Sequence, residues 1–413
     1  MGHPIVIIGA GVAGLVAARH LEKAGFKPLI IEASARAGGR VKTDEKNGFL
    51  LDHGFQVLLT EYREAREYLD YDALDLRHFN PGAVIYAGGR SFRIADPLRA
   101  PARLPGMVFS PVGTLKDKFL MWQLSRELKG MENDALFAVD GKTTEAFLRG
   151  YGFSEKIISQ FFRPFFGGIF LENQLKTGAA MFRFVFRTFS LGNAAVPAGG
   201  MEEIPRQLAT ALKQTTFQFG RKVQTIGEQE VHLEGGQVIP FQQLIIATDP
   251  NGLLSRLGDQ GMEYNRTQNL YFRASRSPLG EPTIGLVADE NNTINNFCTM
   301  TDVAPGYAPQ DEVLLSITLK DWAAQDPPPV ETVAADLHSA TGQADLELTF
   351  LAAYDIPKAL PTLDTLRYDL PATQFRITED IVLAGDYMLN ASLDAAMRSG
   401  RRAAEAVIQV GVA

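Results

Sequence analysis

The amino-terminal hydrophobic pattern changes from a continuous run to a helical period and back. Ile5 to Ile8 is an unbroken run of β-branched residues, which predicts a strand buried on both faces of a parallel sheet. Apolar positions recur at helical spacing over residues 12–23, and Gly25 is expected to end that helix. Leu29 to Ile31 predicts a second buried strand. This βαβ unit predicts an α/β fold with a doubly wound, Rossmann-like parallel sheet.

The middle of the chain predicts a helical segment followed by short strands. Large apolar and aromatic residues at mixed helical periods over 116–128 and 154–170 predict a mostly helical insertion. Short strands and turns are expected from 196 to 250, with Gly235-Gly236 as a hairpin turn and 244–247 as a buried strand.

Alternating segments return in the last third of the chain. Those within 256–355, such as 313–319, predict a second sheet. The proline run 327–329 is expected to start a helix, and residues 381–386 to form a strand that runs into a turn. Residues 392–410 predict a final helix rich in Ala and Arg.

Three glycines stand in the turn between the first strand and the first helix. Gly9 permits the tight turn, Gly11 lets the backbone approach a pyrophosphate, and Gly14 lets helix and strand pack closely. Val12 and Ala13 open the helix, and the amino terminus of a helix favours negative charge. This turn therefore predicts a dinucleotide phosphate site.

An acidic residue follows the second strand. Glu32, with Ala33 beside it, is placed to accept hydrogen bonds from a ribose diol, which favours FAD or NAD over NADP. Gly38-Gly39-Arg40 comes next, where glycine backbone can wrap the same pyrophosphate and the guanidinium can balance its charge. A generic NAD domain does not need this segment, so it favours FAD; a basic surface loop is the alternative.

The carboxyl-terminal strand and helix complete the predicted cofactor site. The Asp386 carboxylate can accept a hydrogen bond from a ribityl hydroxyl, and Gly385 allows close approach. Ser392 is a candidate N-cap for the last helix, which Leu393 opens. If that end points at the flavin pyrimidine, the helix dipole stabilises negative charge on reduced flavin. An Ala-rich packing helix without a ligand is the alternative.

These motifs resemble the flavin-containing amine oxidoreductase superfamily, which includes amine oxidases, protoporphyrinogen oxidases and carotenoid desaturases. Further markers lie in the centre of the chain, at 196–201 and at the strand that leads to Thr248, with Val223 as an adenine-side valine. By this resemblance, 52–56 passes along the flavin ring, with contacts from Gly54, Phe55 and Gln56. The resemblance implies FAD as the cofactor.

The chain departs from amine oxidases where those enzymes commonly place a lysine near flavin N5 and aromatic residues around the substrate nitrogen. The matching strand, 270–273, has no lysine, and 388–391 has no aromatic residue. Lys320 is one candidate substitute. The carboxyl-terminal segment instead resembles plant-type phytoene and ζ-carotene desaturases, although Asp394-Ala395 stands where those usually carry Glu-Gly.

Composition narrows the function classes. Of 413 residues, 46% are apolar and 21% charged, and a net charge of −8 leaves no electrostatic footprint for nucleic acid. Cys298 is the single cysteine, which suits a reducing cytoplasm and leaves no cysteine-based metal set, so no metal site is predicted. The uncharged run from Pro4 to Ala18 lacks a basic flank and is interpreted as folded structure rather than an export signal.

The substrate is expected to be lipophilic. Aromatic residues in 161–170 and 181–189 can form a wall for it or the core of the insertion. Residues 98–122 mix basic and apolar side chains. This mixture is expected of a peripheral membrane-docking element and also of an ordinary solvated face. His53 can move protons or serve a structural role, and the sequence assigns no catalytic acid or base.

We therefore expect an FAD-dependent oxidoreductase that transfers hydride from a hydrophobic, isoprenoid-like or polyene substrate to flavin N5, with quinone or oxygen as electron acceptor. Amine oxidation with oxygen and a redox-neutral flavin-assisted isomerisation are the alternatives. The predicted FAD domain comprises 1–75, 197–255 and 375–413. The substrate domain comprises 76–196 and 256–374.

Overall fold

The first strand, helix and second strand form the predicted βαβ unit. The computed structural model describes residues 3–94, 111–138, 141–253, 262–320 and 327–411. In it, β1 is Ile5–Ile8, α1 is Val12–Lys23 and β2 is Leu29–Ile31, each as the sequence predicts. Both faces of β1 are buried, because Ile7 packs against α1 while Val6 packs in a separate cluster on the opposite face.

A five-stranded, all-parallel sheet organises this part of the molecule. Its order is β10-β2-β1-β14-β20, with β10 at Thr216–Gln218, β14 at Gln243–Ile246 and β20 at Ile381–Leu383. α1, α10 (Glu203–Ala211) and α13 (Leu393–Gly411) pack together on one face. A three-stranded antiparallel sheet covers the other face: β11 (Val223–Ile226), β12 (Glu230–Leu233) and β13 (Val238–Pro240). The α/β, Rossmann-like fold class is confirmed.

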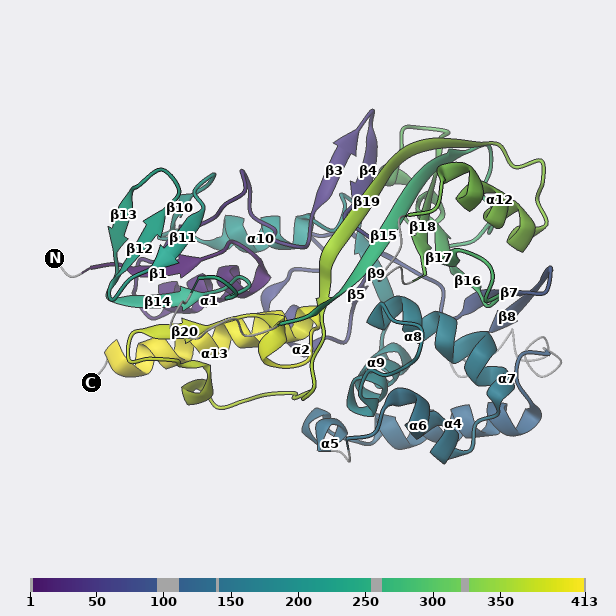
Figure 1. Ribbon diagram of the computed structural model, residues 1–413, viewed down its shortest axis with the longest axis horizontal. Helices are drawn as coiled ribbons and strands as arrows, with labels where there is room; N and C mark the ends of the chain where they lie inside the picture. The colour runs from purple at the N-terminus through teal and green to yellow at the C-terminus, as the bar shows by residue number, and fades with distance from the viewer. Residues whose placement is uncertain (1–2, 95–110, 139–140, 254–261, 321–326, 412–413) are drawn as a thin grey trace.

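A second, seven-stranded sheet forms the other half of the molecule (Figure 1). Its order is β19-β15-β18-β17-β16-β7-β8, and β18 is Val313–Leu319 as predicted. The other strands are β7 (Ala83–Ala87), β8 (Arg90–Ile94), β15 (Tyr264–Ala274), β16 (Ile284–Val287), β17 (Ile294–Thr299) and β19 (Leu348–Pro361). The helix α12 (Val330–Thr341) follows the proline run and packs on this sheet.

The predicted helical insertion lies beside this sheet. It contains α4 (Leu115–Lys129), α5 (Asn133–Phe137), α6 (Thr144–Tyr151), α7 (Glu155–Ile157), the π-helix Ile158–Phe162, α8 (Arg163–Phe170) and α9 (Ala179–Leu191). Of the segment 98–122, the part up to residue 110 lies outside the described residues. Within the described part of the chain, no helix combines the length and apolarity that crossing a bilayer requires.

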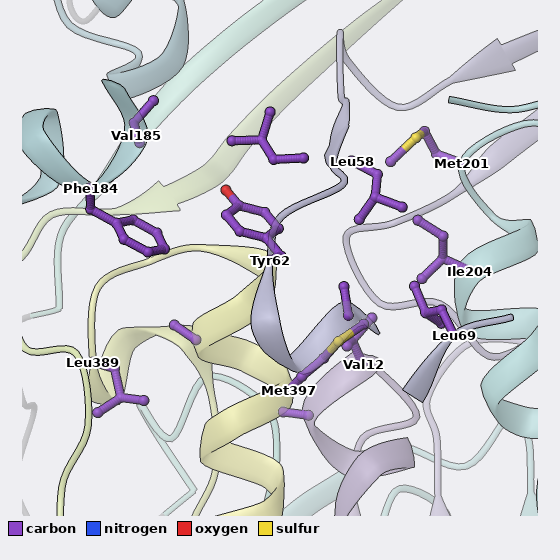
Figure 2. Close-up of a cluster of buried hydrophobic side chains, with 14 of the residues drawn as sticks. Val12, Leu58, Tyr62, Leu69, Phe184, Val185, Met201, Ile204, Leu389 and Met397 are labelled. Carbon is purple, nitrogen blue, oxygen red and sulfur yellow. The ribbon is translucent and has the colours of Figure 1, made fainter. Parts of the chain in front are cut away.

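Short elements complete the fold. They are the hairpin of β3 (Thr43–Lys46) and β4 (Phe49–Asp52) and the small sheet of β5 (Leu58–Leu59), β9 (Ala194–Pro197) and β6 (Leu76–His78). The short helix α2 (Arg63–Tyr68) packs on α13, and α11 (Met300–Val303) packs on β18. Figure 2 shows Tyr62 between Phe184 of α9 and Leu58 of β5. The Tyr62 and Phe184 rings stack at 6.0 Å. One core thus spans the parallel sheet and the insertion, and the domain bounds given above stay a prediction.

The contact between α1 and α13 generates a first prediction. A Cβ at Gly400 would lie 2.2 Å from the Ala13 carbonyl oxygen, so Gly400→Ala must push the two helices apart and is expected to destabilise the fold by about 1–3 kcal/mol. Gly150→Ala is the matched control, because Gly150 is also helical and nothing lies within 4 Å of its missing Cβ. Urea unfolding measures both, and equal stabilities of the two variants would contradict the packing argument.

Candidate functional site

One large cavity connects the glycine-rich turn with the helical insertion. Its volume is about 1900 Å³, and its lining includes Gly11 and Glu32 at one end and Phe165 and Phe189 at the other. Pockets for a single drug-sized ligand are typically about 300–1,000 Å³. The cavity is therefore large enough for a dinucleotide and a second molecule.

The three glycines of the turn differ in what surrounds them. Gly9 has a positive φ of 102°, and a Cβ there would lie 3.0 Å from the Ala247 carbonyl oxygen. A Cβ at Gly14 would lie 2.1 Å from the Gly9 carbonyl oxygen. Gly11 has φ −73°, which suits any residue, and its nearest neighbour would be the Gly39 Cα at 3.9 Å. The chain itself thus requires glycine at 9 and 14, whereas the space beside Gly11 opens into the cavity and suits a ligand.

The glycine-rich turn of residues 9–14 forms the cradle of the site, and the Glu32 carboxylate is fixed at its edge. Its Oε2 accepts a hydrogen bond of 2.7 Å from the Ala10 N–H, and its Oε1 accepts bonds from the N–H (2.8 Å) and Oγ (2.7 Å) of Ser34. Glu32 lines the cavity, so a preoriented acceptor faces the place where a ribose diol is expected.

The two ends of the chain meet at an ion pair. The Arg40 guanidinium contacts the Asp386 carboxylate and also donates 3.1 Å to the Ala359 carbonyl oxygen. The charge of Asp386 raises the pKa of Arg40 above its usual value. Gln56 Nε2 donates 3.0 Å to the Arg40 carbonyl oxygen, which attaches the segment 53–56 to the same corner. Residues predicted to contact different parts of the cofactor are thus held together.

Most of the predicted cofactor residues line this cavity. Those that line it are Gly9, Gly11, Val12, Ala13, Glu32, Gly38, Gly39, Arg40, Gly54, Phe55, Gln56, Thr248, Gly385, Asp386 and Leu393. Gly14 is a packing residue, and Ala33 lies outside the lining. Val223 is buried in the core beneath β11 to β13, away from the cavity. A cofactor contact for Ala33 or Val223 stays a prediction.

The final helix begins at a side-chain cap, as expected. Ser392 Oγ accepts a 3.0 Å hydrogen bond from the Ala395 N–H. Asp394, where the sequence departs from the desaturases, is buried and lies outside the cavity lining. Its carboxylate accepts 2.8 Å from the Glu64 N–H and pairs with Arg398 at 3.0 Å. This departure therefore concerns the contact between α13 and α2 and not the cavity.

Sequence reasoning missed the contribution of β19 to the cavity. Ile356 and Lys358 line it at the two-residue spacing of one strand face, a period that is visible in the sequence but does not say what the face meets. Lys358 Nζ lies 2.5 Å from Asp249 Oδ2 and 5.5 Å from the ring centre of Tyr264. Lys320, the candidate substitute lysine, lies outside this lining and donates 2.8 Å to the Asn292 carbonyl oxygen.

Beneath the segment 53–56 lies a buried carboxyl group. Asp52 Oδ1 accepts hydrogen bonds from Thr43 Oγ1 (2.5 Å) and the Met201 N–H (3.0 Å), and Oδ2 accepts from the Tyr307 hydroxyl at 2.9 Å. Burial raises the pKa of the Asp52 carboxyl to about 6. The next residue, His53, lines the cavity, and its Nε2 lies 2.8 Å from Asp44 Oδ2. His53 is therefore oriented by a carboxylate at the cavity surface.

The raised pKa of Asp52 predicts a pH dependence. The folded state holds this proton more tightly than the unfolded state, whose pKa is 3.8, so its stability falls as pH rises from about 4 to about 6. Asp52→Asn removes this dependence. Between about pH 4 and pH 7 we therefore expect the unfolding free energy of wild type to fall by about 3 kcal/mol relative to that of the variant. Urea unfolding at about pH 4 and pH 7 measures it.

Asp44→Asn is the control for that prediction. Although desolvation opposes the change, hydrogen bonds from Arg36 and His53 lower the pKa of Asp44 below 3.8, so its stabilising contribution is lost only below about pH 4. The difference in unfolding free energy between wild type and Asp44→Asn should therefore stay nearly constant between about pH 4 and pH 7. A difference between wild type and Asp52→Asn that stays constant with pH would contradict the assignment.

The open space at Gly11 gives a test of the cradle. Gly11→Val keeps an allowed backbone and meets no other side chain, so we expect unfolding free energy to change by about 0.5 kcal/mol or less. FAD affinity is expected to fall about tenfold or more, because the new methyl groups occupy the ligand's space. Titration of the apoprotein with FAD measures affinity. Gly14→Ala should instead lose stability, and unchanged FAD affinity in Gly11→Val would refute the cradle.

Comparisons with known proteins agree with this geometry. The family model for flavin containing amine oxidoreductase matches residues 12–408. The L-amino-acid oxidase BmooLAAO-I of Bothrops moojeni is 45% identical over 78 residues, which cover 18% of this chain and 16% of that protein's length. The curated relatives are thus matched over a small part of their length.

Solved structures share the whole fold at low sequence identity. An oxidoreductase from Methanosarcina mazei has a TM-score of 0.75 at 15% identity, covering 97% of this chain and 100% of its own. Cyclohexylamine oxidase from Brevibacterium oxydans has a TM-score of 0.64 at 18% identity, covering all of both chains. The glycine cradle, the fixed Glu32 carboxylate and the family match over nearly the whole chain together show that this protein belongs to the flavin-containing amine oxidoreductase family of FAD-dependent oxidoreductases.

Proposed function

We propose that this protein oxidises a lipophilic, unsaturated small molecule. The observation that carries the proposal is the continuity of the cavity from the FAD cradle into the insertion, where phenylalanines of the π-helix, α8 and α9 line it: Phe161, Phe165, Phe166, Phe170, Phe186 and Phe189. Aromatic walls favour an apolar substrate because its burial removes apolar surface from water on both sides.

When bound, FAD supplies a two-electron acceptor, so that loss of a hydride from one substrate carbon and a proton from its neighbour leaves a new double bond. The chain's own contribution is orientation and exclusion of water. Gly11 and Glu32 hold the dinucleotide end, and the phenylalanine wall aligns an extended substrate. Quinone or oxygen is the proposed final electron acceptor.

Amine oxidation is the second candidate, because the family and an amino-acid oxidase relative both favour it. Tyr264 and Tyr387 line the cavity near Asp386, and aromatic rings there can enclose an amine. These two rings lie outside residues 388–391, the segment in which the resemblance to amine oxidases implies an aromatic residue.

Anaerobic mixing of the holoprotein with substrate panels distinguishes the two functions. Loss of the oxidised flavin absorbance with polyenes or isoprenoids, and not with amines or amino acids, is the expected result. Reduction by amines alone would overturn the lipophilic proposal. Product formation without net flavin reduction or any electron acceptor would favour the isomerase alternative.

The aromatic wall is tested by Phe165→Asn. Phe165 lines the cavity and contacts the rings of Phe161 and Phe189 at 5.4 and 5.3 Å. A polar amide in this wall is expected to raise KM for a lipophilic substrate about tenfold, with flavin content unchanged. Phe350→Asn is the control, because Phe350 is 43% exposed on β19 and lies outside the lining. The same KM in both variants would argue against a substrate site in the insertion.

A further inference from the structure

The helix α4 presents an exposed apolar face. Leu115, Phe119 and Trp122 are 69%, 59% and 40% exposed, and their spacing places them on one side of the helix. The Phe119 and Trp122 rings contact each other at 5.8 Å. The other large exposed apolar residues of the described chain come singly from separate elements: Leu191, Phe219, Val238, Phe350 and Val410. The α4 face is thus a patch rather than a scattered set.

Basic side chains accompany this patch. The helix carries Lys116, Lys118, Arg126 and Lys129, and the Arg126 guanidinium lies 5.8 Å from the centre of the Trp122 ring. Its two acidic residues accept hydrogen bonds within the fold. Asp117 is buried and accepts hydrogen bonds from Thr114 and Ser154, and Glu127 accepts one of 2.9 Å from the Tyr151 hydroxyl. The chain as a whole has a net charge of −8, so the basic side chains beside this apolar face contrast with the overall charge of the protein.

The same helix forms part of the cavity wall. Lys118, Met121, Trp122 and Ser125 line the cavity, so the exposed face and the lining occupy neighbouring flanks of α4. Trp122 belongs to both. A surface in contact with this face therefore lies beside the aromatic end of the cavity.

We propose that the α4 face docks on the surface of an anionic lipid bilayer. Basic residues beside Leu, Phe and Trp are the composition of interfacial helices, in which apolar side chains enter the headgroup region and cations meet anionic lipids. A second copy of the chain fits less well, because a symmetric contact would set cationic faces against each other. Passage of substrate from the bilayer past Trp122 rests on the proposed function, whereas docking itself does not.

Vesicle co-sedimentation of the holoprotein tests the docking. Phosphatidylcholine vesicles containing phosphatidylserine are expected to bind wild type, with binding weakened by salt. The double variant L115S/F119S should lower the bound fraction about tenfold, since each burial in the interface is lost. V238S/F350S is the control, because it removes two exposed apolar residues elsewhere and should bind like wild type.

Equal binding by wild type and L115S/F119S, or no binding of folded wild type, would overturn the proposal. So would a dimer in solution that L115S/F119S converts to monomer, because the face would then be a contact between copies. Turnover of a substrate dispersed in detergent separates the docking proposal from the proposed function. It does not require docking, and Leu115 and Phe119 lie outside the cavity lining. Turnover by a wild-type protein that binds no vesicles would therefore refute docking alone. Vesicle binding without reduction of the flavin by any lipophilic substrate would instead remove the proposed function and leave docking supported.

Discussion

The close backbone contacts on the two sides of α1 determine how the cradle is built. At Gly14 the helix approaches the Gly9 carbonyl so closely that a Cβ would lie 2.1 Å from its oxygen, and at Gly400 the final helix approaches Ala13 to a similar degree. A methyl group at either place would force the helix outward. These contacts fix the amino end of α1 between the first strand and α13, so its unpaired N–H groups point to a defined place.

Because α13 packs on α1, the segment that precedes it is brought to the same cradle. Asp386 reaches Arg40, and Arg40 also holds the Ala359 carbonyl oxygen near the end of β19. A guanidinium carries five donors, so both contacts leave it able to face an anion. Three distant parts of the sequence thereby meet at one side chain, which couples the parallel sheet to the long strands of the second sheet.

The sequence predicts those parts of the site that depend on local pattern. The helix 12–23 and the strand 313–319 occur at the predicted residues because a period of 3.6 or 2 is a property of neighbouring side chains. Lys358 escaped prediction, since alternation along β19 defines two faces but not which of them meets the cavity. The burial of Val223 likewise depends on the pairing of β11 with β12, which the local pattern does not define, and its contact with the cofactor stays a prediction.

The charges at the cradle end bear on which substrates suit the cavity. Arg40 is paired with Asp386, Lys358 with Asp249, and His53 contacts Asp44. A substrate carboxylate that binds one of these cations must compete with a side chain already in contact, and the displaced acid must then be solvated or paired again. An uncharged substrate meets no such competition at these three positions. The pairing of Arg40, Lys358 and His53 with carboxylates therefore supports the proposal of a neutral substrate at this end of the cavity.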